Sequence, residues 1–572
     1  MKSKIAVLLV FVVLSILYTW PLVLHLPNAV TNSGDPLFYA WNLSHNLSSF
    51  SSGIDKIMNT NIFYPTTNTL AFSDTLFTQS LLTFPLLLLT GNPILIQNIY
   101  IIFSFILAGI GVYILALELN VSAIGALVSA ILFAFSYPRL GQLSHISIAS
   151  SFLLPFFFLH MIKFFSKATI LNAVLCVLTF LLLLGSTIYL GIIAGFGAVI
   201  FIGVMLIQNK NYRNVLWSKK ILLTISLIAT LIMSLVILYP YIILRVEHPE
   251  IQRTYDEISS RGAYQKDFSS VLPTSLILSR ILPSGEGERS LYPTLAALIL
   301  ALFGLYTYTR TKNQLLLAFL IVGASGFLLS FGPARPFTFG PFDTGYISLP
   351  YAFFLKILPI LYIIRVPSRF IILFTLALSV FAGMGFDFYK KKSLLLVSLL
   401  VLLFFVETIQ KPLPLIPVPT ETEIPAVYAS IKNDPSVRTI IELPIVEERD
   451  RVGQLPIQEQ VKLRFDEVSI HTPLALETYR TYFSLFHKKQ MINGYSGFVP
   501  QSFHDAVEEM RYFPEERAIS YLKRKKVSHV IIHFWQYSKD QKNSLIQKLS
   551  SLNPSPLYND YGEDRIYTVS SL

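Results

Sequence analysis

Residues 93–116 have the sequence PILIQNIYIIFSFILAGIGVYILA, which contains no charged side chain. An uncharged apolar run of this length is typical of a helix that crosses a membrane. Other segments share this character, and together they predict about eleven crossings. Because 53% of the 572 residues are hydrophobic and only 14% are charged, we expect residues 1–410 to form a polytopic α-helical membrane domain. The apolar segments are residues 5–24, 93–116, 121–137, 146–165, 170–186, 188–207, 221–244, 291–309, 313–331, 367–387 and 393–410.

The apolar run 76–90 is shorter and contains Pro85, so it has two interpretations: a short crossing, or a re-entrant or interfacial helix. If it does not cross, the later basic clusters lie on the same side as Lys2 and Lys4, as expected for cytoplasmic loops. We therefore predict a multi-pass protein of the cytoplasmic (plasma) membrane, with its N-terminus in the cytoplasm and residues 25–92 forming an external loop. The clusters lie within residues 163–167, 210–220, 310–312 and 390–392.

The net charge of +11 also arises from the basic loops of the membrane domain. From residue 411 onward Lys and Arg are as numerous as Asp and Glu, so the whole excess belongs to residues 1–410. A basic excess in the loops of a membrane domain is a signal of orientation, and we expect no nucleic-acid partner. The single cysteine, Cys176, excludes an intrachain disulfide and a metal site built from cysteines.

A second domain is expected after the membrane domain. Residues 411–423 are rich in proline and predict a stiff linker. Residues 424–572 have the charged composition of a soluble domain, with short apolar runs typical of buried strands. We predict an α/β domain on the outer side of the membrane. Its strands are expected at 438–445, 527–533 and 565–569, and its helices at 501–512, 514–526 and 538–551.

The external loop carries a carboxylate near each end, Asp35 and Asp74. Residues 36–50 repeat apolar side chains at helical spacing and predict an amphipathic helix at the membrane surface. Asp35 lies between a glycine and a proline, so it is expected to cap this helix. A carboxylate fixed in this way is also well placed as a general base. Asp74 has the same two interpretations, as a helix cap or as a second site carboxylate.

Two further outward segments carry arginines. Residues 136–145 include Arg139, Gln142 and His145, which can bind a substrate or simply anchor and cap helices. The segment Arg365-Val366-Pro367-Ser368-Arg369 joins a surface helix, predicted at 350–364, to a crossing helix. Its arginines can extend to lipid head groups, but a phosphate site uses both guanidinium groups and the helix terminus at once. We therefore favour phosphate binding there.

Short motifs along the chain resemble those of one superfamily. With one membrane helix, a long external loop with an early acid, many crossings and an external soluble tail, the chain resembles the GT-C membrane glycosyltransferases. The likeness is to prokaryotic members of that superfamily and covers most of the chain. The motifs are Gly34-Asp35-Pro36, Phe63-Tyr64-Pro65, Phe133-Ala134-Phe135-Ser136-Tyr137-Pro138-Arg139-Leu140, Arg365-Val366-Pro367-Ser368-Arg369 and Asn493-Gly494-Tyr495-Ser496-Gly497.

This resemblance implies inverting transfer of a sugar from a polyprenyl-phosphate donor in the membrane lipid to a glycan, lipid or protein acceptor on the outer face. Asp35 would accept the proton of the acceptor hydroxyl. Arg139, Arg365 or Arg369 would stabilise the leaving phosphate, and His145 would orient the acceptor or the phosphate. Tyr495 is a candidate acceptor contact, although its Asn-Gly neighbours also indicate an ordinary turn.

Two alternatives concern the chemistry. Many relatives carry adjacent acids in the first loop, whereas Pro36 follows Asp35 here, so a single base without a metal is the simpler expectation. A divalent metal held by Asp35 and Asp74 is the alternative, and the sequence specifies no other cofactor. A transporter or flippase of lipid-linked saccharides, or a non-catalytic envelope-assembly protein, are the alternatives to a transferase. The sequence shows no inverted repeat, which disfavours the transporter.

Overall fold

The computed structural model describes residues 2–53, 56–249, 251–285, 287–339, 342–419, 423–446, 461–462, 469–470, 473–553 and 555–572. The chain forms two compact units, each built from segments that are far apart in sequence. Unit 1 comprises Met1–Leu24, Ile99–Tyr239 and Gln252–Leu413. Unit 2 comprises His25–Asn98, Pro240–Ile251 and Pro414–Leu572. The loop that follows the first apolar helix thus belongs to the same unit as the C-terminal tail.

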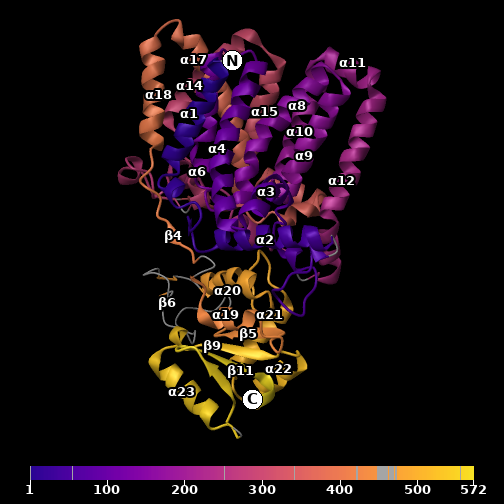
Figure 1. Cartoon of the computed structure of the whole chain (residues 1–572). Helices are drawn as coiled ribbons and strands as arrows, with labels where there is room; N and C mark the ends of the chain where they lie inside the picture. The colour runs from indigo at the N-terminus through magenta and orange to yellow at the C-terminus, as the bar shows by residue number, and fades with distance from the viewer. Residues whose placement is uncertain are drawn as a thin grey trace. The chain divides into compact units, whose positions relative to one another are not determined.

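Unit 1 is a bundle of apolar helices (Figure 1). Each segment that the sequence predicts to cross the membrane is helical, because its apolar side chains favour internal backbone hydrogen bonding. The helices, counting α4 and α12 whose larger parts lie in unit 1, are α1 (Lys2–Tyr18), α4 (Pro93–Glu118), α5 (Ala123–Ala134), α7 (Ile146–Ala149), α8 (Leu153–Ser166), α9 (Ile170–Ser186), α10 (Ile188–Gln208), α12 (Lys220–Glu247), α14 (Leu295–Thr311), α15 (Gln314–Ser330), α17 (Ile371–Lys390) and α18 (Leu394–Thr408).

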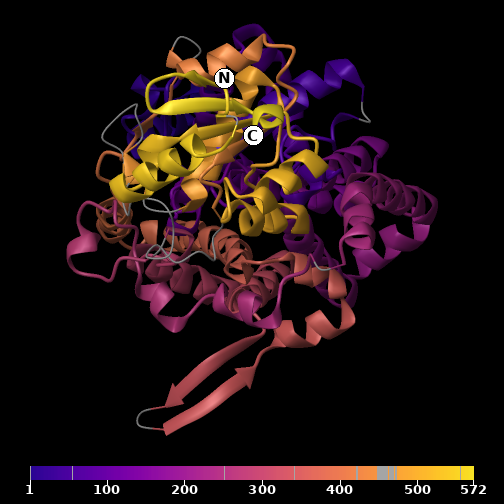
Figure 2. The ribbon, with the colours of Figure 1, turned by 90° about the horizontal axis from the view of Figure 1, so that it is seen from below.

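Short elements connect these helices. The predicted surface helix at 350–364 is observed as α16 and the 3-10 helix η8, and Pro359 begins η8 after the break. The sequence did not predict the antiparallel hairpin of β2 and β3, which extends away from the helices of unit 1 (Figure 2). The connecting elements include α6 (Tyr137–Leu140), α11 (Lys210–Ser218), α13 (Tyr255–Ser260), η7 (Gly287–Arg289), β2 (Ala334–Phe339), β3 (Phe342–Ser348), α16 (Pro350–Ile357), η8 (Pro359–Ile363) and η9 (Pro367–Phe370).

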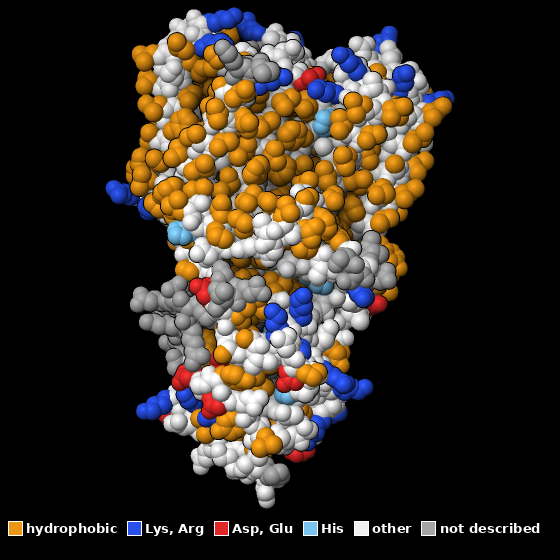
Figure 3. All heavy atoms as spheres, viewed as in Figure 1, with side chains coloured by type: hydrophobic (Ala, Val, Ile, Leu, Met, Phe, Trp, Pro, Cys, Tyr) orange, Lys and Arg blue, Asp and Glu red, His pale blue; other side chains and the backbone are white. Residues whose placement is uncertain are grey.

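The exposure of the apolar helices indicates that a membrane surrounds them. Five helical segments of the described chain are long and apolar enough to cross one. The apolar window of Pro367–Lys390 is 78% buried within the protein, whereas that of α12 is 0% buried. An exposed helix that is apolar all round needs an apolar surrounding. Figure 3 shows a broad band of hydrophobic side chains over unit 1, with Lys and Arg gathered at the end where α11 and the N-terminus lie.

Unit 2 contains a five-stranded mixed sheet in the order β10-β11-β9-β5-β8. Its inner strands β5 (Thr439–Leu443) and β9 (His529–His533) are parallel and entirely buried. Strands covered on both faces read as continuous apolar runs, which explains why the sequence predicts them correctly. Strand β11 pairs with β9 in the antiparallel direction, and the predicted last strand is thereby observed. The other strands of the sheet are β8 (Gln490–Met491), β10 (Tyr558–Asp560) and β11 (Asp564–Thr568).

Helices accompany this sheet. The predicted helices at 501–512, 514–526 and 538–551 are observed, each slightly shorter than expected. The sequence did not predict α20, which carries charged side chains that the structure buries. The helices of the tail are α19 (Ala426–Lys432), α20 (Pro473–His487), α21 (Gln501–Met510), α22 (Glu516–Arg524) and α23 (Lys539–Ser550).

Backbone hydrogen bonds join the first loop to the tail. Strand β1 (Ala29–Val30) pairs with β4 (Ile416–Pro417), so the proline-rich segment is held at that point. Further along, the Tyr64 N–H donates to the Met491 carbonyl at 2.9 Å, and the Phe498 N–H donates to the Phe72 carbonyl at 2.9 Å. These bonds satisfy main-chain groups of both segments. The loop and the tail therefore form one folded body.

The predicted amphipathic helix is observed as α2 (Asp35–Ser52), and the run 76–90 as α3 (Phe77–Thr90). The polar face of α2 is turned into unit 2. Asn42 and Asn46 are 0% exposed. Their amides donate to the carbonyls of Asp74 at 2.9 Å and Thr75 at 2.8 Å. Buried amides need such partners, so this face anchors the end of the loop to α2.

Candidate functional site

Asp35 is the first residue of α2, and Gly34 takes the N-cap position. The prediction that Asp35 itself caps the helix is therefore wrong. Its Oδ1 accepts a hydrogen bond of 2.6 Å from the hydroxyl of Tyr495, which lies 460 residues further along the chain. This hydrogen bond fixes the direction of the Asp35 carboxylate at the start of α2. The structure thus brings together the first and the last of the predicted site residues, Asp35 and Tyr495.

The turn before Tyr495 fits tightly against the first loop. The Asn493 carbonyl accepts from the Phe63 N–H at 3.2 Å. A Cβ on Gly494 would lie 2.9 Å from the Phe63 ring and 3.0 Å from Ile62 Cβ, so only glycine permits this approach. The Tyr495 ring itself packs edge-on against Phe38 of α2, with 5.5 Å between the ring centres. Both neighbours fix the direction of the Tyr495 hydroxyl.

A buried ion network lies behind this turn. Glu477 of α20 accepts from the Asn493 amide at 3.2 Å and from the Gly494 N–H at 3.3 Å, and it also pairs with Arg480. Arg480 lies 3.6 Å from Glu442 Oε2. Sequence reasoning missed these residues, although one signal was present: Glu442 interrupts an apolar run that reads as a buried strand. A charge in such a run indicates a buried partner.

The network continues to His533, whose Nε2 lies 2.9 Å from Glu442 Oε2 and whose Nδ1 lies 2.9 Å from Asp564 Oδ1. Burial alone would raise the pKa of Glu442, but hydrogen bonds and charges from His533 and Arg480 outweigh it and hold the pKa below the usual value. Burial alone would lower the pKa of His533, but the two carboxylates outweigh it and raise the pKa.

These shifts predict a pH window for the stability of unit 2. The contribution of Glu442 is present above its ordinary pKa of 4.5 and is lost as the pH falls through the lower folded value. The contribution of His533 is complete below its ordinary pKa of 6.5 and is lost as the pH rises through the higher folded value. Amide exchange in β5 and β9 should therefore be slowest, after correction for intrinsic rates, between about pH 4.5 and 6.5. Protection that keeps rising above this window would contradict the assignment.

Replacing Tyr495 with phenylalanine tests the contact with Asp35. The variant keeps the ring packed against Phe38 but removes the donor. We expect turnover to fall by about tenfold, because hydrogen bonds to charged groups contribute on the order of 1.5–3 kcal/mol. Tyr512→Phe, at an exposed position of the tail, is the matched control; equal turnover for both variants would contradict the contact's role.

Asp74 lies beside a later turn of α2 than the one that carries Asp35. Its carbonyl accepts from Asn42, which follows Asp35 by about 10 Å along the helix axis. Leu76, and not Asp74, takes the N-cap position of α3, so the predicted cap is wrong. Within the described residues no group of three or more His, Cys, Asp or Glu side chains could hold a metal ion.

In unit 1, Arg369 stands at the start of the last long apolar segment and pairs with Glu288. Its Nε and one terminal nitrogen lie 3.0 and 2.9 Å from Glu288 Oε2. The guanidinium also lies over the ring of Tyr189, 4.6 Å from its centre, as expected for a cation–π contact. Sequence reasoning missed both partners, because neither the acid nor the tyrosine belongs to a recognisable motif.

Arg365 does not share the carboxylate of Arg369. Its Nε lies 3.0 Å from Oε1 of Glu257, which also pairs with Arg253 at 2.9 Å. The Tyr189 hydroxyl accepts the backbone N–H of Arg365 at 2.7 Å. Tyr189 thus fixes the backbone of one arginine and the side chain of the other. The two guanidinium groups therefore pair with different carboxylates, and their shared use of one phosphate stays a prediction.

The remaining candidates of residues 136–145 differ in role. Arg139 is 3% exposed and donates to Ser151 Oγ at 2.6 Å and to the Ser104 carbonyl at 3.1 Å. These bonds, inside the helix bundle, fit the interpretation of Arg139 as a structural anchor. His145 takes the N-cap position of α7. Gln142 is 6% exposed and lines the same cavity as Arg369, so these two predicted residues are brought together.

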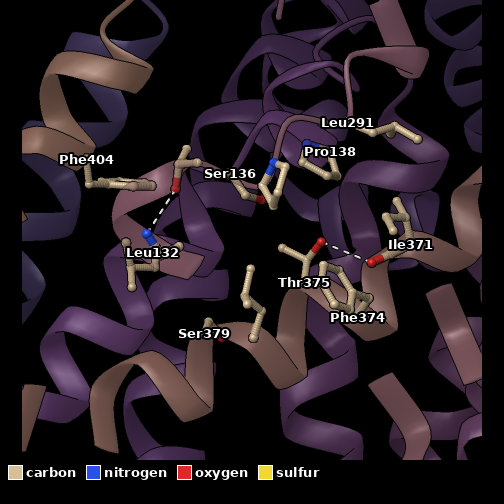
Figure 4. Close-up of a pocket in the computed structure, with 13 residues that line it drawn as sticks. Leu132, Ser136, Pro138, Leu291, Ile371, Phe374, Thr375, Ser379 and Phe404 are labelled. Carbon is tan, nitrogen blue, oxygen red and sulfur yellow. Dashed lines mark hydrogen bonds between the residues drawn. The ribbon is translucent and has the colours of Figure 1, made fainter. Parts of the chain in front are cut away.

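Two small cavities lie on either side of Pro138, Leu291 and Ile371, which line both. The first, drawn in Figure 4, holds about 10 Å³. Its hydroxyl groups are engaged within their own helices: Thr375 donates to the Ile371 carbonyl at 3.0 Å and Ser379 to that of Leu376 at 2.7 Å. This cavity is a packing gap. The second, about 20 Å³, contains the charged pair of Arg369 and Glu288.

An acid at the head of the first loop, a bundle of membrane helices and a tail that folds with that loop define a GT-C-like fold, and comparison with solved structures confirms this fold. The chain is similar to arabinofuranosyltransferase AftD from Mycobacteria, with a TM-score of 0.59 and 12% identity over 99% of this chain and 40% of that one. It is also similar to the oligosaccharyltransferase of Archaeoglobus fulgidus, with a TM-score of 0.52 and 12% identity over 93% of this chain and 69% of that one. This chain therefore spans 40% of the length of AftD. No family model and no curated protein sequence matches it.

Proposed function

We propose that the protein is an inverting glycosyltransferase that moves a sugar from a polyprenyl-phosphate carrier to a glycan, lipid or protein acceptor on the outer face of the cytoplasmic membrane. The observation that carries this proposal is the Asp35 carboxylate, held at 2.6 Å by Tyr495 in a chain with a GT-C-like fold. The membrane helices suit a donor that arrives through the bilayer. The basic end of unit 1 supports a cytoplasmic N-terminus.

In the proposed reaction Asp35 takes the proton of the acceptor hydroxyl while the oxygen of that hydroxyl attacks the anomeric carbon. The bond between that carbon and the phosphate oxygen breaks, and the phosphate leaves with the electron pair. Tyr495 fixes the direction of the Asp35 carboxylate, so it is a positioning residue. Asp74 and Arg139 fit structural roles better.

The test uses the full chain in nanodiscs with a panel of short-chain polyprenyl-phosphate sugars and an extract of the cell envelope as acceptor. A transferase releases polyprenyl phosphate and forms a new glycosidic bond, both visible by mass spectrometry. A flippase would instead move a fluorescent analogue across proteoliposomes without cleaving it. An assembly protein would do neither. Cleavage of no member of the panel, together with flipping, would overturn the proposal.

A further inference from the structure

The cavity beside Arg369 has polar walls in an otherwise apolar part of unit 1. It is enclosed by the apolar side chains of Leu190, Ile193 and Ile372. The polar side chains that line it come from three separate segments of the chain. They are Gln142, Ser151, Glu288, Ser368 and Arg369.

Two of these side chains each carry one polar atom that has no hydrogen-bond partner in the part of the chain that the structure describes. Gln142 is 6% exposed and Ser368 is 1% exposed, and neither Gln142 Oε1 nor Ser368 Oγ has a hydrogen-bond partner among the described residues. Buried polar atoms are nearly always paired, and leaving one unpaired costs on the order of 1–3 kcal/mol. Both atoms belong to residues that line the same cavity. Such atoms point to a ligand that brings hydroxyl or phosphate oxygens.

The pairing of Arg369 with Glu288 is one that a better anion can replace. Both guanidinium donors converge on the same oxygen, Glu288 Oε2, at 3.0 and 2.9 Å. The strongest guanidinium contacts give each nitrogen an oxygen of its own. A phosphate group offers several oxygens and a larger charge, so it can form this parallel pair.

The cavity is too small for a phosphate group while the Glu288 carboxylate lies beside Arg369. The cavity holds about 20 Å³, which is roughly the room needed for one water molecule. The segment that carries Glu288 packs closely against Gly141, because a Cβ on Gly141 would lie 2.7 Å from the Gly287 carbonyl oxygen. A phosphate can therefore occupy the position beside Arg369 only when the Glu288 side chain turns away from it.

We propose that Glu288 is an internal anion that occupies a phosphate site formed by Arg369, Ser368 and Gln142, and that a phosphate ester displaces it. The phosphate pairs with Arg369, a protonated phosphate oxygen or a sugar hydroxyl donates to Gln142 Oε1, and Ser368 donates to a phosphate oxygen. The identification of the ester with a lipid-linked sugar rests on the proposed function. The exchange of anions does not.

The test measures binding, which needs no acceptor and no turnover. Full-length protein in nanodiscs is titrated calorimetrically with geranyl phosphate, and separately with inorganic phosphate. Glu288→Gln keeps the shape of the side chain but removes its charge, so we expect the Kd for phosphate to fall by about tenfold, since a charge-assisted contact no longer competes. Glu257→Gln is the matched control, because Glu257 pairs with Arg365 at 3.0 Å and does not line the cavity. The double variant with Arg369→Met should lose the gain.

Equal gains for both probes would assign the site to phosphate alone, and a gain for geranyl phosphate only would assign it to a lipid head group; both support the exchange. Binding no tighter in Glu288→Gln than in the unaltered protein, or an equal gain in Glu257→Gln, would overturn it. If Glu288→Gln does not fold, Glu288→Asp gives a second reading, because its shorter side chain reaches Arg369 less well and should give a smaller gain. A chain that binds phosphate in this way but transfers no sugar would separate this inference from the proposed function.

Discussion

Asp35→Asn should abolish most of the transfer activity while leaving the fold intact. The asparagine side chain has the same size, and its amide oxygen can still accept the 2.6 Å hydrogen bond of Tyr495. It cannot take a proton from an acceptor hydroxyl. General bases contribute about 10²- to 10⁴-fold to catalysis, so we expect turnover of the polyprenyl-phosphate sugar to fall by about this factor. The measurement is the rate of polyprenyl phosphate release at saturating donor.

Two controls sharpen this result. Asp505→Asn changes a carboxylate of α21 on the surface of the tail and should leave turnover unchanged. Asp74→Asn should cost far less than Asp35→Asn, because the backbone of Asp74, held by Asn42, ties the loop to α2. If Asp74→Asn and Asp35→Asn are equally damaging and a chelator abolishes turnover, the two acids act together on a metal. Unchanged turnover in Asp35→Asn would remove Asp35 as the base.

The helices of unit 1 could be predicted because their signal is local. A run such as 93–116 is apolar throughout, and the observed helix α4 matches it within two residues. The buried strands β5 and β9 were predictable for the same reason. The helix α2 was also predicted, but the direction of its polar face was not. Periodicity tells which residues share a face, and it does not tell whether Asn42 and Asn46 meet water or buried carbonyls.

The candidate site was less predictable because its contacts join distant parts of the chain. Nothing near Asp35 in sequence indicates that Tyr495 donates to it across 460 residues. The arginine motif draws attention to Arg369, but its partner Glu288 lies in an unpatterned loop 81 residues earlier. Such pairings depend on which segments pack together, and a single sequence carries no direct record of that packing. The same reason explains why the first loop and the tail were predicted as separate parts.

Arg480→Met should destabilise unit 2 more than any other substitution considered. Arg480 is 2% exposed, contacts both Glu442 and Glu477, and donates to the Pro444 carbonyl at 2.9 Å and to Gln536 Oε1 at 2.9 Å. Without it, two carboxylates remain buried with no arginine between them. Breaking a buried ion pair from one side costs about 3–5 kcal/mol. Local unfolding measured by amide hydrogen exchange in β5 and β9 should become easier by this amount.

A comparison of Arg480 with Arg517, another arginine of unit 2, tests whether burial of the ion pair causes the loss of stability. Arg517 also forms a short contact, 2.7 Å from its Nε to Glu509 Oε2, but its side chain is 56% exposed. Exposed pairs contribute little, so exchange in Arg517→Met should match the unaltered protein. Adding Glu442→Gln and Glu477→Gln to Arg480→Met removes the stranded charges and should recover part of the loss. Equal losses in Arg480→Met and the triple variant would instead attribute the effect to lost packing.

Because Glu477 also accepts from Asn493 and Gly494, Arg480→Met should loosen the turn before Tyr495 and reduce turnover at temperatures where β5 and β9 remain protected.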